Sequence, residues 1–456
     1  MSSKVFTLNV LEQCRVSPPP NSTQTKTFPL TFLDIPWLFF SPNNPLFFYE
    51  FPHSVSHFMA TIVPKLKLSL SLTLQHYYPF AASFVSPPGT GKPHLVFTDG
   101  NSVSLEIAES NGDFDHCCSY YPRDASEFHL LAPKLTPCEK KDSPLLAIQV
   151  TIFRNAGFCI GIAYHHVVAD GRTFNNFVKT WASYCRYETT SFNLKLIPFY
   201  DRSVIIDTHE LEVVFLGQWR KRKLAQGIAI GREVRVDLSG MVRATFTMGS
   251  AEMEHIKHWI IARCKKKNLS QPLRLSPYIL TCAFLWVCLL KTHRIEDEND
   301  PSYFGFVAGG MTRLPFSVPT TYLGNFVGFG RASGSRNELL GEDGIVVAAK
   351  AIAKTVKQLD LSIFSGSEKW VLDWDVLFGS EHHVMVTGSP KVDLYGTDFG
   401  WGRPKKIEDI SIDNTKAISL TESRDLEGGI EIGIALPKDK MDIFTILFTQ
   451  GLKALS

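Results

Sequence analysis

The chain has 456 residues, of which 44% are hydrophobic, 12% aromatic and 20% charged, and its formal net charge is +2 at pH 7. This length is too great for one ordinary core and predicts two domains of about 200 residues each, and the composition excludes a disordered chain. The small net charge argues against nucleic acid as the main partner but leaves room for a local basic patch.

The spacing of the cysteines and the length of the apolar segments indicate the cellular compartment. The nine cysteines are odd in number and show no C-x-x-C spacing, which favours reduced thiols packed as small hydrophobes. The N-terminus lacks the apolar core of a signal peptide. The apolar run at residues 278–290 is about a dozen residues long, too short to span a membrane. We therefore expect a cytoplasmic protein without a membrane partner.

Hydrophobic spacing predicts four elements in the first quarter of the chain. They are a strand over residues 4–11, an amphipathic helix over 57–76, and strands over 94–98 and 102–108. The glycine-containing segment 86–93 lacks the spacing of a phosphate-binding loop, which favours an ordinary turn.

A strand over residues 145–153 and an apolar run over 158–164 predict a hairpin, and the second strand ends in an ionisable pair. His166 and Asp170 are four residues apart and would share a face on a turn or helix. Histidine titrates near neutrality, so it can take a proton from an alcohol and return it. The carboxylate could fix the imidazole tautomer or pair with an arginine. Two specified positions are a weak signal in a chain with 14 His and 45 acidic residues.

The second half predicts further helices and strands, separated from the first by an irregular segment. A helix over residues 172–186 follows Asp170, and the basic run at 220–223 indicates a solvated helix face. The elements expected after it are a strand over 242–247, helices over 251–266 and 278–290, a strand over 304–309, a helical segment over 370–378, strands over 411–412, 417–422 and 429–435, and a helix over 438–452.

A second motif, Asp398-Phe-Gly-Trp-Gly402, lies near the C-terminus. Together with His166-x-x-x-Asp170-Gly171, it resembles the plant BAHD acyltransferases of specialised metabolism, which move acyl groups from coenzyme A thioesters to alcohols or amines. The segment Pro29-Leu-Thr-Phe-Leu-Asp34 is similar to an N-terminal landmark of that family. The resemblance covers essentially the whole chain.

The resemblance implies an α/β fold. It consists of two similar chloramphenicol-acetyltransferase-like domains, each a mixed β-sheet with flanking helices, and the active site lies in a channel between them. We place the N-terminal domain at residues 1–190, the crossover at 191–235 and the C-terminal domain at 236–456. By analogy with the family we expect a monomer.

The resemblance also assigns roles. His166 resembles the general base that deprotonates the acceptor hydroxyl for direct attack on the thioester, with acyl-CoA as co-substrate and with neither a metal nor a permanently bound cofactor. Asp170 resembles the acid that orders the loop and points away from the substrate. The residues that resemble the family's architectural motif, with Asp398 expected in an ion pair, are Asp398, Phe399, Gly400, Trp401 and Gly402.

Candidate coenzyme A contacts come from the same resemblance. They are Ser276, ahead of the buried helix, and Thr387, Ser389 and Lys391, ahead of the second motif. Lys391 would suit a 3′-phosphate, which requires a cation. The alternative is a solvated surface lysine.

The stretch Thr387-Gly-Ser-Pro-Lys391 and its neighbours resemble the branch that acylates sugar hydroxyls of anthocyanins, flavonoids and other phenolic glucosides. That branch uses malonyl or hydroxycinnamoyl donors. Arg172 is placed to bind the carboxylate of a malonyl group, or it caps the loop instead. A hydroxycinnamoyl donor would need an aromatic slot, which 33 Phe can supply. Malonyl is our first expectation.

The chain departs from the family pattern in a few places. Leu323 and Phe326 stand where relatives have Phe and Cys, and Gly309 and Met311 where they have Asp and Arg. Pro277 replaces a Ser or Thr. We expect these changes to affect the acceptor.

Two other classes of function remain open. A metal enzyme could use His165, His166 and Asp170, or the pair His382-His383, although adjacent histidines on a strand point to opposite faces. A non-catalytic relative could bind coenzyme A or a phenolic ligand without turnover.

Overall fold

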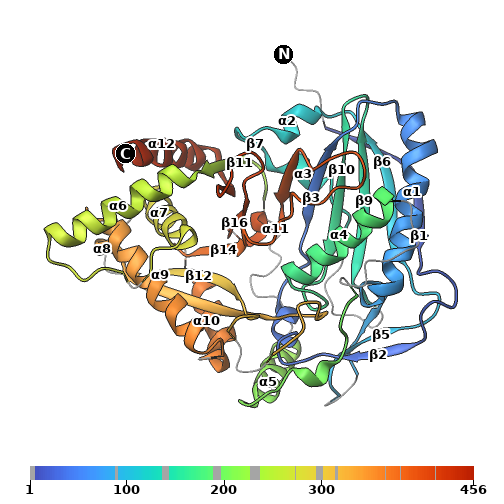
Figure 1. Ribbon diagram of the computed structural model, residues 1–456, viewed down its shortest axis with the longest axis horizontal. Coiled ribbons are helices and arrows are strands. Elements are labelled where there is room, and N and C mark those ends of the chain that lie inside the picture. Colours follow the sequence, from blue (N-terminus) through green and yellow to red (C-terminus); the bar gives the residue numbers. More distant parts are fainter. Residues whose placement is uncertain are drawn as a thin grey trace.

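The structure is a computed structural model. It describes residues 6–87, 91–135, 143–187, 197–225, 237–272, 274–293, 301–313, 317–364, 366–380, 382–415 and 417–455. The ends of the expected crossover, residues 191–196 and 226–235, lie outside these ranges. Figure 1 shows two lobes, one built mainly from the first half of the chain (blue to green) and the other from the second half (yellow to red).

The first lobe contains a six-stranded mixed sheet. Its strands, in spatial order, are β1 (Leu8–Val16), β6 (Val103–Ser110), β9 (Leu146–Phe153), β10 (Gly157–Tyr164), β3 (Pro45–Glu50) and β15 (Lys406–Asp409). Every residue of β9 and β10 is buried, because both faces of the sheet are covered. The helices that belong to this lobe are α1 (Val55–His76), α2 (Phe114–Cys118), α3 (Ala125–His129) and α4 (Gly171–Tyr187).

Alternate residues of β3 belong to two different cores. Phe47 and Tyr49 pack in the large cluster that includes residues of α1 and α4, whereas Leu46 and Phe48 pack in a smaller cluster with residues of α2 and α3. This is the period-two alternation of a strand that is buried on both faces.

The second lobe contains a seven-stranded mixed sheet. Its strands, in spatial order, are β13 (Val327–Ser335), β12 (Pro301–Gly309), β14 (Val384–Gly388), β16 (Ala417–Glu422), β17 (Ile430–Pro437), β11 (Met241–Met248) and β7 (Arg123–Asp124). Its helices are α6 (Ser250–Lys266), α7 (Pro277–Lys291), α8 (Arg336–Leu340), α9 (Gly344–Leu361), α10 (Trp370–Gly379), α11 (Ser411–Thr415) and α12 (Lys438–Leu455). The helix α7 is buried on almost every side, as its continuous apolar run predicts.

The two large sheets share the same order of parallel and antiparallel strand pairs, although no internal repeat is visible in the sequence. In the series β6-β9-β10-β3-β15 the first pair is parallel and the next three are antiparallel, and β14-β16-β17-β11-β7 follows the same rule. The last strand of each series comes from the other half of the chain. The predicted fold class is therefore confirmed, with one strand exchanged in each direction.

A small sheet and the described part of the crossover complete the fold. The small sheet has the order β2 (Lys26–Pro29), β5 (His94–Phe97), β4 (Ser83–Val85) and β8 (Ser143–Pro144). The crossover carries the short helix η4 (Arg202–Val204) and α5 (Leu211–Leu224), and α5 packs against η1 (Ile35–Phe39).

Several sequence predictions need correction. The strand predicted at residues 411–412 is wrong: these residues begin α11, and the neighbouring strand is β15. The strand β13 was not predicted from the sequence. Its Gly328 and Gly330 lie in extended backbone, and a Cβ atom at either position would come within 3.0 Å of a packed side chain. These glycines therefore allow a close approach between layers.

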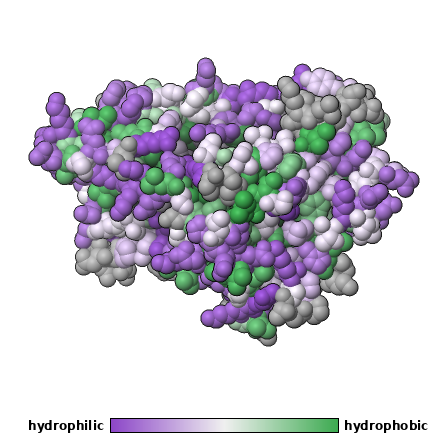
Figure 2. Space-filling view, turned by 60° about the horizontal axis from the view of Figure 1, so that its bottom comes forward, coloured by the Kyte–Doolittle hydropathy of each residue, from purple (hydrophilic) through white to green (hydrophobic). Residues whose placement is uncertain are grey.

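Exposed apolar side chains of the described residues occur on several elements of the surface. Within the described ranges, no helix combines the length and apolarity needed to cross a bilayer. The face drawn in Figure 2 is mainly hydrophilic, with apolar side chains in groups between the polar ones. Among the strongly exposed apolar residues, Val213 and Leu224 lie on α5 and Leu361 ends α9, and such exposure is normal for a folded protein.

Candidate active site

His166 lies in the short turn between β10 and α4, at the edge of a large cavity. The cavity has a volume of about 1420 Å³ and is lined by residues from both halves of the chain, including Trp37, His166, Phe326 and Thr387. A rigid strand end that opens into a cavity is the usual position of a reactive side chain.

The imidazole of His166 is held by an amide. Its Nδ1 lies 2.8 Å from Oδ1 of Asn325. The amide orientation is fixed because Nδ2 of Asn325 donates to Oδ1 of Asp34 (3.0 Å) and to the carbonyl of His166 (2.8 Å). Oδ1 must therefore face the imidazole and accept a proton from Nδ1. This tautomer leaves the Nε2 lone pair available as a base.

Asp34 holds Asn325, and through it the imidazole of His166, in position. It is fully buried and accepts hydrogen bonds from the backbone N–H of both Thr31 (2.8 Å) and Asn325 (3.1 Å). Arg202, from the crossover, pairs with its carboxylate at 3.2 Å and donates to the hydroxyl of Tyr322 at 2.7 Å. The orientation of His166 thus depends on the N-terminal segment, the crossover and the second half of the chain together.

The indole of Trp37 covers one face of the imidazole. The ring centroids of Trp37 and His166 are 3.7 Å apart, with an interplanar angle of 17°. Burial lowers the pKa of His166 to about 4, and this outweighs the nearby carboxylates of Asp170 and Asp34, which raise it. His166 is therefore neutral at pH 7 and can accept a proton.

Asp170 does not touch the imidazole nitrogens. Its Oδ1 accepts from the backbone N–H of Thr173 (2.8 Å) at the start of α4, and its Oδ2 accepts from the N–H of Phe326 (3.0 Å). The carboxylate thus caps a helix and ties the loop to the 324–326 segment. These contacts favour the loop-ordering role over a direct action on the His166 tautomer.

Arg172 lines the cavity but also supports its wall. The guanidinium donates to the carbonyl oxygens of Thr320 and Tyr322 and lies 3.8 Å from Oδ2 of Asp170. An arginine has five N–H donors, so these bonds leave some free for a ligand. Both interpretations of Arg172, the loop cap and the carboxylate clamp, are compatible with its position.

All four expected coenzyme A residues line the same cavity. Ser276 also caps α7, accepting from the N–H of Ile279 at 3.4 Å. Ser389 accepts from the N–H of Lys391 at 3.3 Å. Thr387 and Lys391 bracket this turn after β14, with the Lys391 side chain exposed.

The second motif lies outside the cavity lining, where it builds a compact turn. Oδ1 of Asp398 accepts from the N–H of Gly400 (2.8 Å) and of Gly402 (3.0 Å), and its other oxygen pairs with Arg186. The expected ion pair of Asp398 is therefore present. Both glycines have positive φ angles, +114° and +99°, which disfavour a side chain. Phe399 and Trp401 stack on each other 5.6 Å apart.

Most of the departures from the family pattern lie on the cavity wall. Pro277, Gly309, Met311 and Phe326 line it, whereas Leu323 is buried behind it. Beside His166, four aromatic side chains line the cavity and contact one another: Trp37, Phe40, Trp374 and Phe378. This aromatic wall was not predicted as a unit, because its two pairs, Trp37 with Phe40 and Trp374 with Phe378, are more than 300 residues apart in sequence.

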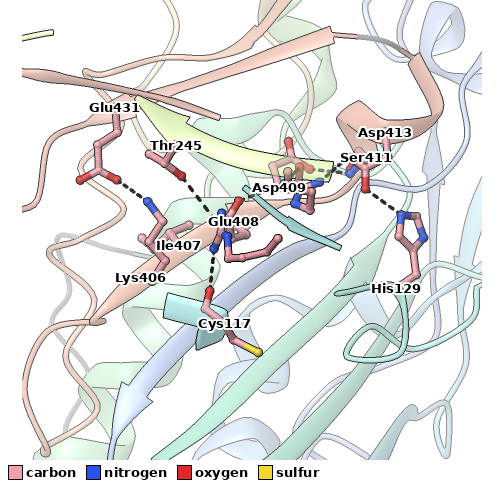
Figure 3. A network of polar contacts seen from close by, with 12 residues as sticks. Cys117, His129, Thr245, Lys406, Ile407, Glu408, Asp409, Ser411, Asp413 and Glu431 are labelled. Atoms are coloured by element: carbon pink, nitrogen blue, oxygen red, sulfur yellow. Dashed lines mark hydrogen bonds and ion pairs between the residues drawn. The ribbon is translucent and has the colours of Figure 1, made fainter. Parts of the chain in front are cut away.

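A network of charged side chains occupies the junction where the two sheets exchange strands (Figure 3). Glu408 lies at its centre and pairs with Arg123 at 2.7 Å and with Arg243 at 3.0 Å. Asp413 pairs with Arg243 and with His129. The remaining pair joins Lys406 to Glu431 at 3.1 Å.

The alternative of a metal enzyme named two groups of possible ligands, one around His166 and one at His382 and His383. Neither forms a metal-binding cluster among the described residues. Across the described ranges, no three His, Cys, Asp or Glu side chains come together in an arrangement that could hold a metal ion. His382 lies beside His293, and the ring of His383 packs on Phe378.

The chain is similar to known proteins in both sequence and fold. The model of the Transferase family matches residues 6–449. The chain is 36% identical over 98% of its length to phenolic glucoside malonyltransferase 2 of Arabidopsis thaliana, all of which is covered. It is 34% identical to an anthocyanidin 3-O-glucoside coumaroyltransferase of the same plant, with 99% of each chain covered. The crystal structure of vinorine synthase superposes with a TM-score of 0.72 at 17% identity, with 97% of this chain and 98% of that chain covered.

Proposed function

Because the chain belongs to the Transferase family of BAHD acyltransferases, we propose that it moves an acyl group from coenzyme A to a sugar hydroxyl of a phenolic glucoside. The observation that carries this proposal is the neutral imidazole of His166, with Nδ1 held by Asn325 at the wall of a cavity lined by both halves of the chain. Relatives named for malonyl and coumaroyl transfer to glucosides support the substrate class.

In the proposed reaction, Nε2 of His166 takes the proton of the acceptor hydroxyl as its oxygen attacks the thioester carbonyl carbon. The resulting tetrahedral intermediate collapses, the carbon–sulfur bond breaks, and the thiolate takes the proton back from Nε2. Acceptor ester and free coenzyme A are the products, and the histidine returns to its starting state. One positioned base suffices for this sequence, with no covalent acyl-enzyme.

The proposed path of coenzyme A passes Ser276, Thr387, Ser389 and Lys391. Their support is that all four line the cavity that His166 faces. The charge of Lys391 suits a phosphate group of the donor.

Two donors fit this reaction, and different observations support each. A malonyl donor, our first candidate, is supported by Arg172 in the cavity wall and by the malonyltransferase relative. A hydroxycinnamoyl donor is supported by the aromatic wall beside His166, which suits a planar ring.

A donor competition tests the proposal. Purified protein is given malonyl-, acetyl-, coumaroyl- and caffeoyl-CoA with a flavonoid glucoside, and the products are identified by mass. His166→Ala should abolish every product. Malonyl transfer that falls selectively in Arg172→Ala supports the carboxylate clamp, whereas coumaroyl transfer indifferent to Arg172 removes the malonyl assignment. Binding of coenzyme A without any product would indicate a non-catalytic relative, and full activity in His166→Ala would refute the mechanism.

A further inference from the structure

One carboxylate at the strand-exchange junction, that of Asp409, lines the cavity and is influenced by the charge of Arg243 without a direct ion pair among the described residues. Glu408, Asp413 and Glu431 are each paired with at least one basic side chain. Asp409 makes no ion pair within the described part of the chain, although it stands next to Glu408 in β15. Arg243 donates to the backbone carbonyl of Asp409 (2.9 Å) and not to its carboxylate.

The carboxylate of Asp409 also has unused acceptor capacity. Its Oδ1 accepts from the N–H of Ser411 at 3.0 Å, and the hydroxyl of Ser411 also interacts with the carboxylate, which leaves part of its acceptor capacity unused. Burial raises the pKa of this group above its ordinary value. A partly buried carboxylate that lacks a direct ion pair and whose burial outweighs its favourable contacts is costly for a folded chain, so its presence in a cavity wall points to a ligand.

Asp409 faces the cavity that contains His166, and the sheet fixes their relative positions. In the order β10-β3-β15, Asp409 at the end of β15 lies opposite Pro45, and Asn43 pairs with Tyr164 at the end of β10. Two strand spacings separate β15 from β10, about 10 Å. Figure 3 shows Asp409 beside Ser411 on the edge of the charged network.

Small polar side chains line the cavity at this edge of the sheet, along with Pro45 and Tyr164. Those that line the cavity near the β3–β15 edge are Ser41, Asn43, Ser411 and Thr415. A carboxylate with an amide and hydroxyls is a set of groups that can bind several hydroxyls at once. The same carboxylate would repel a phosphate or a malonyl group, so this part of the cavity suits a neutral ligand.

We propose that Asp409 accepts a hydrogen bond from a ring hydroxyl of the acceptor's glucosyl group, and so presents another sugar hydroxyl to His166. This inference rests on the proposed function. A pyranose with its hydroxyls bridges a gap of this size, and an O–H donor to a carboxylate makes one of the stronger hydrogen bonds in proteins. Asp409 thus determines that the acceptor is a sugar and which of its hydroxyls reacts.

The experiment uses the full-length enzyme with one phenolic β-glucoside and its 2-, 3- and 4-deoxy analogues. Wild type is compared with Asp409→Ala and Asp409→Asn, and with Asp425→Ala as an exposed control. For the intact glucoside, kcat/KM should fall at least tenfold in Asp409→Ala while the KM for acyl-CoA changes less than twofold. With wild type, one deoxy analogue should have a kcat/KM as low as the intact glucoside has with Asp409→Ala. With Asp409→Ala, that analogue and the intact glucoside should have the same kcat/KM.

The thermal midpoint separates binding from structure. Because the burial of the Asp409 carboxylate outweighs its favourable contacts, its removal should leave the midpoint unchanged or raise it. The inference would be overturned if Asp409→Ala lowered kcat/KM equally for every analogue or left it unchanged for the intact glucoside. Transfer by the wild type in the same assay would leave the proposed function intact. A wild type that acylates no glucoside at all would instead overturn the proposed function.

Discussion

Glu408→Gln tests the charged junction between the sheets. The carboxylate of Glu408 lies between Arg123 and Arg243, which face one another in the β7–β11 ladder. Glutamine keeps the shape and can accept one hydrogen bond but carries no charge. Arg243 retains Asp413, whereas Arg123 loses its carboxylate partner. The two buried guanidinium groups then face each other with less negative charge nearby to offset their repulsion.

Two routes give the size of the effect. Removing one partner of a buried ion pair costs about 3–5 kcal/mol. Burial by itself would raise the pKa of Glu408, but Arg123 and Arg243 outweigh burial and lower it from 4.5 to about 2. A difference of about 2.5 in pKa corresponds to about 3 kcal/mol. For a domain of about 200 residues, 3 kcal/mol lowers the thermal midpoint by about 6–12 °C.

The assay is thermal and urea unfolding of wild type, Glu408→Gln and the exposed control Glu427→Gln at several pH values. Because the folded pKa of Glu408 is depressed, its stabilisation is complete above pH 4.5 and is lost as the pH falls toward 2. The gap between wild type and Glu408→Gln should therefore be widest at neutral pH and narrow below pH 4.5. A variant as stable as wild type at pH 7, or a gap independent of pH, would refute this reasoning.

Three further predictions concern the base and its supports. Asn325→Ala removes the acceptor that fixes the His166 tautomer, and kcat should fall about 100-fold with little change in the KM for acyl-CoA; unchanged kcat would exclude the orienting role. Trp37→Ala exposes the imidazole, so the pKa of His166 should rise from about 4 toward its ordinary value and the acid limb of the kcat/KM profile should move to higher pH; a fixed limb would contradict it. Asp398→Ala should lower the thermal midpoint without changing the pH profile, because its contacts are with backbone N–H groups and Arg186.

The sequence predicted the position of His166, the proposed base, better than it predicted the residues around it. A buried strand ending in His166 is a local pattern, and the structure places it as expected. Asp34 ends the quoted segment Pro29–Asp34, and Asn325 lies between the noted positions Leu323 and Phe326, but nothing local indicates that Asp34 and Asn325 meet. Their contact spans 291 residues. Trp37 had no signal at all, since one aromatic near a predicted landmark is more often core than active site.

Periodicity recovered most of the long elements, but the 18-residue helix α9 was missed along with several short or unusual strands. The helices α1, α4, α6, α7 and α12 follow their apolar spacing closely. The strands β7 and β15, with two and four residues, are too short for a pattern and are stabilised by ion pairs that become visible only in three dimensions. In β13, glycines needed for close packing removed the β-branched signature of a strand.

The strand exchange links folding to the chemistry. The half that carries His166 gains the orienting amide of Asn325 and the carboxylate of Asp409 only when the second half is in place. Arg123 and Glu408, which fasten the exchanged strands, are each contributed to the opposite sheet. A weakened junction should therefore displace β15 relative to β10 and change the distance between the base and the proposed sugar site. The loss of activity in Glu408→Gln should then exceed its unfolded fraction, because molecules that remain folded hold Asp409 less firmly.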